Sequence, residues 1–212
     1  RVLNQVGEPS LANQSPATQD AEDVRASEAF IVASLVHDAG HWPFCHPIED
    51  MGQSGMLRHE ERVEAMLRSG PLADALLADW SCTADDVMAY PAATPSEHIA
   101  FYASCLSGPI DVDKLDYLQR DSLHAGVPYG RNFDPMRIIA SLVRHPHRPK
   151  LAIHEKGRTA AEMMVFGRYV MFSEVYWHHT VRSATAMLQR AVHELQQTVD
   201  GQNVDVAEWM DL

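Results

Sequence analysis

The sequence is poor in cysteine, in positive charge and in long apolar runs. It has three cysteines, Cys45, Cys82 and Cys105, without a C-x-x-C pair, which argues against a disulfide framework and against a zinc knuckle. Its 17 Lys and Arg residues against 29 Asp and Glu give a net charge of -12, which argues against the basic surface that binds nucleic acid or an anionic membrane. No run reaches the ~18 apolar residues of a membrane-spanning helix, and the amino terminus lacks the apolar core of a signal peptide. We therefore expect a protein of the reducing cytoplasm that associates with no membrane and forms no stable complex with nucleic acid.

The length and the apolar periodicity predict one helical domain spanning residues 1–212. A chain of this length buries roughly 70% of its unfolded surface, so its core needs no disulfides. Residues 1–20 are rich in Asn, Gln, Ser and Pro without a sustained period, which predicts a loop or a poorly ordered segment. Helical patterns follow at 21–36, 59–70, 71–80, 83–90, 96–108, 111–121, 134–145 and 158–199. Residues 150–157 alternate apolar with polar and predict half of a small β-hairpin, so the expected fold class is all-α with one small hairpin.

Histidine is unusually frequent, with 12 in the chain, and three of them cluster in SLVHDAGHWPFCH, residues 34–46. His37 and Asp38 follow an apolar helical pattern, so we expect them at the buried carboxyl end of a helix. An imidazole and a carboxylate side by side can bind one divalent cation, and mixed nitrogen and oxygen ligation suits Mn, Fe, Co, Ni or Zn. Two ligands seldom suffice, and DVDKLDYLQRD, residues 111–121, offers a third in Asp113.

The segment 111–121 predicts a helix with a chemically varied face. At 100° per residue, Asp113, Tyr117 and Asp121 fall within an arc of about 80°, with Lys114 at its edge.

The HD pair and the helix face at 111–121 also have ordinary explanations. An HD dipeptide occurs often by chance, and a DxDK helix face is usually solvated charge. The combination of the two long motifs in one chain favours a functional site.

Four motifs in the same order carry a family resemblance. They are HDAGHWPFCH at 37–46, RHEE at 58–61, DVDKLDYLQRD at 111–121 and GRYVMFSEVYWHH at 167–179. With them the chain resembles the HD-domain metal-dependent phosphohydrolases, and most closely their deoxynucleoside triphosphate triphosphohydrolase branch. The resemblance extends from about residue 21 to residue 190. It implies the HD-domain helical fold, a nucleotide substrate and one divalent metal ion, for which Mn, Fe, Co, Ni, Zn and Mg are all candidates.

The resemblance also implies roles for individual side chains. Three would bind the metal: His37, Asp38 and Asp113. Four would form the catalytic pocket: the histidines His41, His46 and His59, and Glu49 as the acid that partners them. Five would contact the substrate: Lys114, Tyr117 and Arg168 at the phosphates and the pocket, and Asp121 and Tyr176 at the nucleoside. The helical period gives independent support, because Arg168 and Tyr176 fall within about 80° of each other, so a guanidinium and a phenol point the same way.

Three features depart from the family pattern. The family's metal site has a further histidine upstream of the HD pair, whereas no histidine precedes His37 here. Either that helix is lost or residues are missing from the sequence after Gly7, and we expect the second, which would give four protein ligands. Trp42 stands where the family commonly has a small residue, so we expect a narrower pocket mouth. The chain ends at Leu212 without the carboxyl-terminal lobe of larger members, so we expect little dNTP-driven tetramer assembly, and a homodimer stays among the alternatives.

Three functional interpretations follow. The first is hydrolysis of a dNTP to a deoxynucleoside and triphosphate, in which a metal activates water and the pocket histidines shuttle the proton. The second is an HD-type nucleotidase or phosphodiesterase acting on another nucleotide. The third is a degenerate HD module that binds a nucleotide or a partner without catalysis, supported only by the missing upstream histidine. The four phosphate- and pocket-facing groups favour a triphosphate, because a monoesterase has no evident need for so many.

Overall fold

The computed structural model describes residues 16–52, 57–91 and 99–198, and these ranges are predominantly helical. The α-helices are α1 (Pro16–Val36), α2 (Cys45–Glu49), α3 (His59–Arg68), α4 (Pro71–Asp79), α5 (Ala84–Met88), α6 (Ala100–Leu106), α7 (Val112–His124), α8 (Pro135–Ala140), α9 (Arg158–Met171) and α10 (His179–Thr198). Strands β1 (Leu142–Arg144) and β2 (Leu151–Ile153) form an antiparallel hairpin with Leu142 opposite Ile153. Short 3-10 segments occur at Tyr129–Arg131 and Glu155–Gly157, and a π-helical turn, Phe172–Tyr176, joins α9 to α10. The predicted fold class, all-α with one small hairpin, is confirmed.

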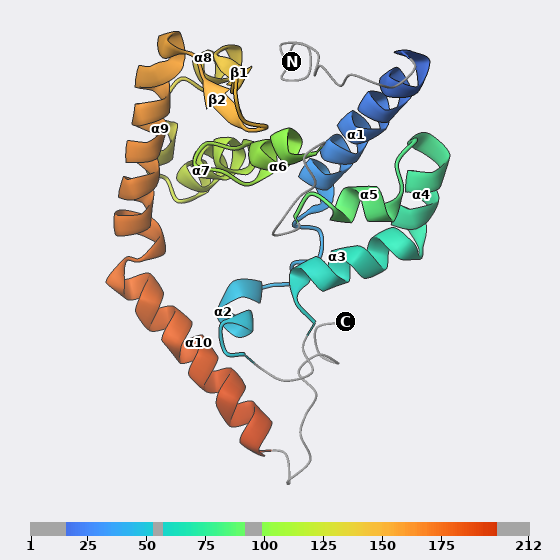
Figure 1. The fold of residues 1–212 in the computed structure, drawn as a ribbon. Helices are drawn as coiled ribbons and strands as arrows, with labels where there is room; N and C mark the ends of the chain where they lie inside the picture. The colour runs from blue at the N-terminus through green and yellow to red at the C-terminus, as the bar shows by residue number, and fades with distance from the viewer. Residues whose placement is uncertain (1–15, 53–56, 92–98, 199–212) are drawn as a thin grey trace.

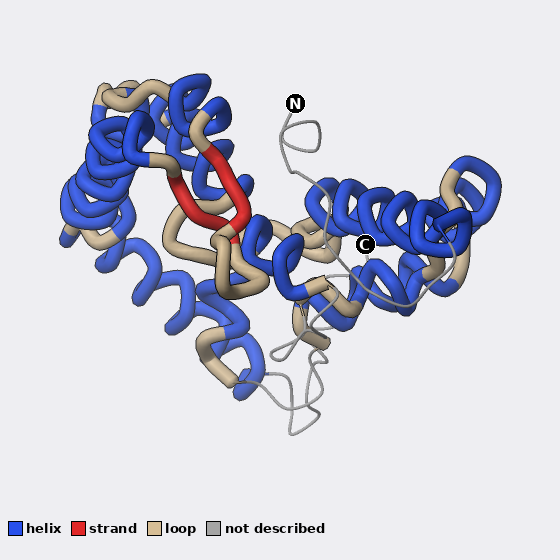
Figure 2. Tube along the Cα trace, turned by 45° about the horizontal axis from the view of Figure 1, so that its top comes forward, coloured by secondary structure: helices blue, strands red, loops and turns tan. Residues whose placement is uncertain are grey.

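The helices form two groups that meet at α6 and α7. Figure 1 shows α1, α3, α4 and α5 on one side and α8, α9 and the hairpin on the other, with α6 and α7 between them. In Figure 2 the hairpin lies beside the helices of the second group. Helix α10 leaves the end of α9 at an angle and runs toward α2, where the Gln189 side-chain amide donates to the Pro47 carbonyl oxygen at 2.7 Å.

Each group has its own hydrophobic core. The first core contains Ala29, Phe30, Val32, Ala33, Val63, Leu67, Leu76, Cys82, Val87, Tyr90, Phe101, Ala103, Cys105 and Leu106. The second contains Leu115, Leu118, Phe133, Ile138, Leu142, Met164 and Met171. Leu151 of β2 packs against both cores, so the hairpin links the two groups. Helix α1 therefore ends against the first core, and α7 is anchored in the second.

Several helix starts lie where the capping residues predict them. The Thr83 hydroxyl accepts from the Asp86 backbone N–H at the start of α5, and Asp134 accepts from the Arg137 N–H at the start of α8. Pro135 occupies the first turn of α8, where its missing N–H costs no helical hydrogen bond. The predicted start at Ser96 lies outside the described residues, and α6 begins at Ala100.

Two predicted boundaries are wrong within the described ranges. Residues 16–20 belong to α1 and not to a loop, because Pro16 opens the helix at a position that tolerates proline; residues 1–15 lie outside the described residues. The helix predicted over 134–145 ends at Ala140, and residues 142–144 form β1. Pairing with β2, which a local pattern does not encode, overrides helical periodicity there.

We predict that Leu118→Ala lowers the free energy of unfolding by about 2–5 kcal/mol, because Leu118 is 0% exposed in the second core and its truncation leaves a cavity. Leu77→Ala is the matched control, since Leu77 of α4 is 79% exposed. Urea denaturation followed by circular dichroism measures both variants. Equal effects of the two substitutions would contradict the assigned core.

Candidate metal and phosphohydrolase site

The site is built on a tight turn that follows α1. The His41 backbone N–H donates to the Asp38 carbonyl oxygen at 3.1 Å, so the chain reverses directly after the HD pair. Gly40 packs against the start of α3 so closely that a Cβ at this position would lie 2.1 Å from the His59 carbonyl oxygen. Only glycine fits this approach without a backbone shift, and the approach places the HD turn beside His59.

His37, Asp38 and Asp113 converge from the turn and from α7. His37 Nε2 lies 3.5 Å from Asp38 Oδ1 and 3.6 Å from Asp113 Oδ1, and the potential ligand atoms all lie within 4.8 Å of one another. The His37 Nδ1–H donates to the Ser34 carbonyl oxygen at 3.1 Å, which leaves Nε2 directed at the carboxylates. Asp113 raises the pKa of His37 against the effect of burial, and His37 in turn lowers the pKa of Asp113.

The HD pair is less buried than the apolar sequence before it predicts. Helix α1 ends at Val36, so both residues lie in the turn and not in the helix. The His37 side chain is 27% exposed and that of Asp38 is 59% exposed. The expected buried helix end is therefore wrong for Asp38, whose carboxylate is open to solvent. An exposed carboxylate next to a half-buried imidazole remains accessible to a cation.

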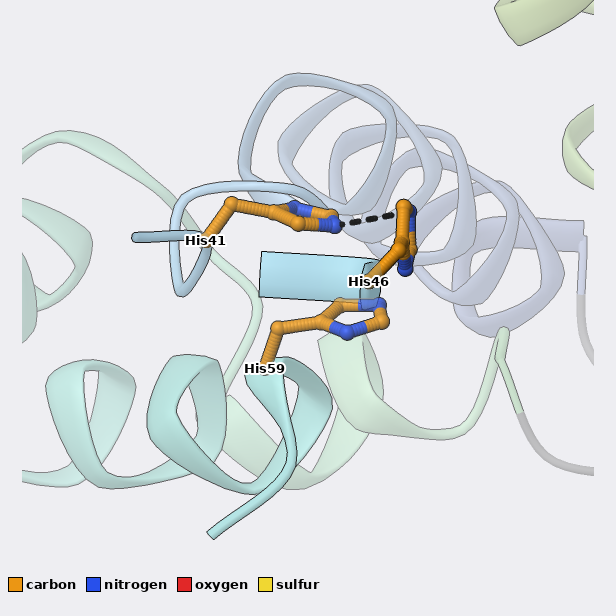
Figure 3. Close-up of side chains that lie close together, drawn as sticks. All are labelled: His41, His46 and His59. Atoms are coloured by element: carbon orange, nitrogen blue, oxygen red, sulfur yellow. Dashed lines mark hydrogen bonds between the residues drawn. The ribbon is translucent and has the colours of Figure 1, made fainter. Parts of the chain in front are cut away.

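A second cluster contains three histidines, and we call it the histidine cluster: His41, His46 and His59 (Figure 3). His41 Nε2 and His46 Nε2 are hydrogen-bonded at 3.1 Å. The ring of His41 stacks on that of His59 with centroids 4.0 Å apart, and His46 meets both rings edge-on. The cluster adjoins the HD pair, because His41 Nδ1 lies 3.5 Å from Asp38 Oδ1.

Glu49 of α2 orients the cluster. Its carboxylate accepts the His59 backbone N–H at 2.8 Å, and both of its oxygens lie 3.1 Å from His59 Nδ1. Burial alone would raise the pKa of Glu49, but the hydrogen bonds from His59 lower it to about 2. Glu49 is therefore ionised at neutral pH, and it fixes both the start of α3 and the tautomer of its first side chain. Burial raises the pKa of the neighbouring Cys45 thiol to about 11, so this thiol is protonated.

A cavity of about 270 Å³ opens at the first cluster and reaches one member of the histidine cluster, His59. Its polar lining comes from His37, Asp38, His59, Glu60, Ser107, Asp111, Asp113 and Lys114. The expected narrowing by Trp42 is wrong within the described part of the chain, because the buried indole packs under the Arg62 guanidinium at 5.3 Å and does not line this cavity. A larger cavity of about 1090 Å³ between α6, the hairpin and α9 contains none of the site residues predicted from the sequence.

Sequence reasoning missed Asp111. This side chain is 1% exposed, caps α7 by accepting the Lys114 backbone N–H at 2.8 Å, and pairs with Lys114 Nζ at 2.6 Å. It thereby holds the ammonium group at the edge of the cavity. Asp111 stands directly before α7, and an Asp at this position signals a helix cap. Its contact with Lys114 cannot be read from the sequence, because the contact depends on burial.

The remaining predicted substrate residues form a third group on α7, on α9 and in the π-helical turn that follows α9. The Tyr176 hydroxyl donates to Asp121 at 2.6 Å, and its ring lies 6.4 Å from that of Tyr117. Burial raises the pKa of Tyr176 further above its ordinary value. The exposed Arg168 guanidinium stands 5.0 Å from the Phe172 ring, which in turn contacts Tyr176 at 5.2 Å. The structure thus brings the predicted residues into three groups, and helix α7 contributes to the first and the third.

Comparisons with known proteins identify the superfamily of this chain. Residues 133–212 match the family described as the HD associated region. The chain belongs to the HD-domain superfamily. It is 33% identical to the Bacillus subtilis protein YwfO over 173 residues, which cover 82% of this chain and 38% of that protein. It is 26% identical to the deoxynucleoside triphosphate triphosphohydrolase SAMHD1 homolog of Dictyostelium discoideum over 198 residues, covering 85% of this chain and 36% of that one.

A solved structure of a hypothetical protein from Aquifex aeolicus superposes on this HD domain with a TM-score of 0.70 and 27% identity. The match covers 90% of this chain and 50% of that one, and this chain spans about two fifths of the length of its curated relatives. Within the described ranges, none of the helices combines the length and hydropathy needed to cross a bilayer.

We predict that Gly40→Ala destabilises the protein by about 1–3 kcal/mol and displaces the HD turn from α3, because the added Cβ would collide with the His59 carbonyl oxygen. Ala39→Ser adds one atom at the adjacent exposed position and serves as the control. Thermal unfolding reports stability, and histidine ring NMR spectra report the His37 and His59 environments. Unchanged histidine resonances in Gly40→Ala would contradict this account of the turn.

Proposed function

We propose that this HD domain carries the centre of a metal-dependent phosphohydrolase that acts on nucleotides, and that it cleaves a dNTP to a deoxynucleoside and inorganic triphosphate. The observation that carries the proposal is the convergence of His37, Asp38 and Asp113 on a cavity that His59 of the histidine cluster also lines. The SAMHD1 homolog of Dictyostelium, named as a triphosphohydrolase, supports the finer assignment.

The first cluster fits a divalent metal by its donor set. It offers one imidazole nitrogen oriented by a carbonyl, and two carboxylates, within the reach of one ion. A metal held by these three residues supplies Lewis-acid chemistry, since it polarises a phosphoryl oxygen and lowers the pKa of water toward neutrality. Asp38 is exposed and Asp113 half-buried, so the site has an open side toward the cavity.

The histidine cluster is arranged to move a proton. The ionised Glu49 accepts the Nδ1–H of His59, which leaves His59 Nε2 for exchange with a ligand in the cavity. His41 and His46 share one proton between their Nε2 atoms, and the His46 side chain is 67% exposed. The cluster thus has one imidazole at the cavity and another at the solvent-exposed side, which suits the general acid and base roles of hydrolysis.

Local positive charge would hold the phosphates in an otherwise acidic protein. Lys114 borders the cavity and is fixed by Asp111, while Arg168 is exposed on α9 against Phe172. A guanidinium binds phosphate through paired charge-assisted hydrogen bonds, and a lysine acts as a point charge. In the proposed complex these two groups face the triphosphate, and Tyr117, Asp121 and Tyr176 face the nucleoside.

We predict that Asp38→Ala abolishes hydrolysis together with metal binding at the site of His37, Asp38 and Asp113, and leaves the helical fold intact, because the Asp38 side chain is 59% exposed. Asp74→Ala, at an exposed position in the first turn of α4, is the control. Metal analysis of the purified full-length variants, combined with circular dichroism and a hydrolysis assay, measures the effect. Full metal occupancy with lost activity would assign Asp38 a role other than ligation.

We predict that dGTP incubated with the full-length protein and Mn²⁺ yields deoxyguanosine and triphosphate in a single step. In the proposed reaction water adds to the α-phosphorus and the bond to the sugar oxygen breaks, so the three phosphates leave as one unit. The histidines would supply the proton to the sugar oxygen, and a metal held by His37, Asp38 and Asp113 would activate the water. Anion-exchange chromatography separates the products. Orthophosphate as the first product would replace this assignment with a nucleotidase, and a panel of nucleotides and metals without any product would favour a binding module.

We predict that Arg168→Ala weakens binding of a nucleoside triphosphate about ten- to a hundredfold, because charge-assisted hydrogen bonds are lost. Binding of the matching nucleoside should change little. Arg190→Ala on α10, also an exposed arginine, is the control. Calorimetry with a non-hydrolysable analogue provides the measurement. Equal losses of affinity for the triphosphate and the nucleoside would show that Arg168 supports the fold or the site that binds the base.

A further inference from the structure

The histidine cluster has a feature that proton transfer alone does not require. The His41 and His46 rings direct their Nε2 atoms at each other and the His59 ring stacks on that of His41, and one potential ligand atom from each histidine lies within 4.8 Å of the other two (Figure 3). His41 and His46 come closest, with their Nε2 atoms 3.1 Å apart. Three imidazoles gathered from the turn, from α2 and from the start of α3 are a set of ligands as well as a set of bases.

The surroundings of two rings fix the tautomer that a metal ligand needs. The Asp38 carbonyl oxygen lies 3.0 Å from His41 Nδ1 and can only accept, so Nδ1 carries the proton and Nε2 keeps its lone pair. Glu49 does the same for His59 through its contacts of 3.1 Å with Nδ1. Metal-binding histidines characteristically donate their second ring N–H to a carbonyl or a carboxylate in this way.

The spacing is close to that of a four-coordinate zinc site. A Zn–N bond of about 2.0–2.1 Å at tetrahedral angles places two ligand nitrogens about 3.3 Å apart. The His41–His46 pair already has a separation of 3.1 Å, and no pair of the potential ligand atoms exceeds 4.8 Å, so ligation by all three requires up to about 1.5 Å of closure and rotation of the His41 and His59 rings out of their stacked arrangement. Rotation of the exposed His46 side chain supplies part of this movement. Glu60 Oε1 lies 3.5 Å from His59 Nε2 and adds an oxygen donor beside the three nitrogens.

We propose that His41, His46 and His59 form a second metal site, which binds a borderline transition-metal ion such as Zn²⁺ and is distinct from the site at His37, Asp38 and Asp113. The two sites differ in their donor chemistry. Three imidazoles select zinc and its neighbours over Mg²⁺ and Mn²⁺, which prefer oxygen, whereas the first site has two carboxylates for one imidazole. The solvent-exposed side of His46 provides access for the ion.

This site has a regulatory consequence that rests on the proposed function. An ion at the histidine cluster occupies the lone pairs that would otherwise carry protons, so Zn²⁺ inhibits the Mn²⁺-supported hydrolysis. The inhibition requires no structural change elsewhere in the protein. Metal binding itself does not depend on the proposed function and is the decisive measurement.

Equilibrium dialysis of the tag-free, full-length protein against Zn²⁺, with metal analysis, tests the second site. The wild-type protein should bind two equivalents, Asp38→Ala one and His46→Ala one, and the double variant neither. His46 is the residue of choice because its exposed side chain leaves no cavity when truncated. His147→Ala, in the turn between β1 and β2, removes an exposed histidine from outside the cluster and should retain both equivalents.

A second comparison separates the cluster from its neighbour. Cys45, Glu49 and His59 also lie within 4.8 Å of one another, but the Cys45 thiol is buried, with 3% of its residue surface exposed. Cys45→Ala should therefore retain the second equivalent. Loss of that equivalent in Cys45→Ala, its retention in His46→Ala, or a single equivalent in the wild-type protein would each overturn the proposal. A dGTP assay run in parallel distinguishes this failure from failure of the proposed function, because either result can occur without the other.

Discussion

The site depends on the contact of two backbones at Gly40 and His59. With no side chain on Gly40, the turn that carries the HD pair rests directly on the first residue of α3. Glu49 reinforces the same junction by accepting both the backbone N–H and the ring N–H of His59. The HD turn, α2 and the start of α3 are thus fixed against one another, although each of these segments is short. The HD turn and the histidine cluster owe their mutual distances to this junction, whereas α7, which carries Asp113, is held by the second core.

In this acidic protein, the position of the Lys114 cation at the cavity is set by a contact with a single neighbouring carboxylate. A net charge of -12 would repel a polyphosphate at long range, so binding requires cations held at short range against their own counter-ions. Asp111 does this for Lys114: it is buried, caps the helix, and leaves the ammonium group at the cavity edge. The Asp111 carboxylate thus stabilises the start of α7, and the Lys114 ammonium group is left at the surface of the cavity.

Sequence reasoning reached the helical class and most helix starts, because capping residues such as Thr83 and Asp134 act locally. It also selected side chains that the fold brings into three groups, of which His37, Asp38, His59, Asp113 and Lys114 line the cavity, because motif order and helical spacing can be read from the sequence alone. It could not place β1, whose conformation depends on pairing with residues 151–153, nor the packing of Trp42 under Arg62. The role of Asp111 and the mutual orientation of the three histidine rings were equally hidden, because both depend on contacts between segments. The functional roles of the assembled residues stay predictions.

The π-helical turn at Phe172–Tyr176 ends the helical run of α9, and the helix is broken at residues 177–178 before α10 begins at His179. The break sets the direction in which α10 leaves α9 (Figure 1), and along that direction the Gln189 side chain reaches the Pro47 carbonyl oxygen in α2. A deletion in the turn would therefore change where α10 meets α2, and with it the support of the segment that carries His46 and Glu49.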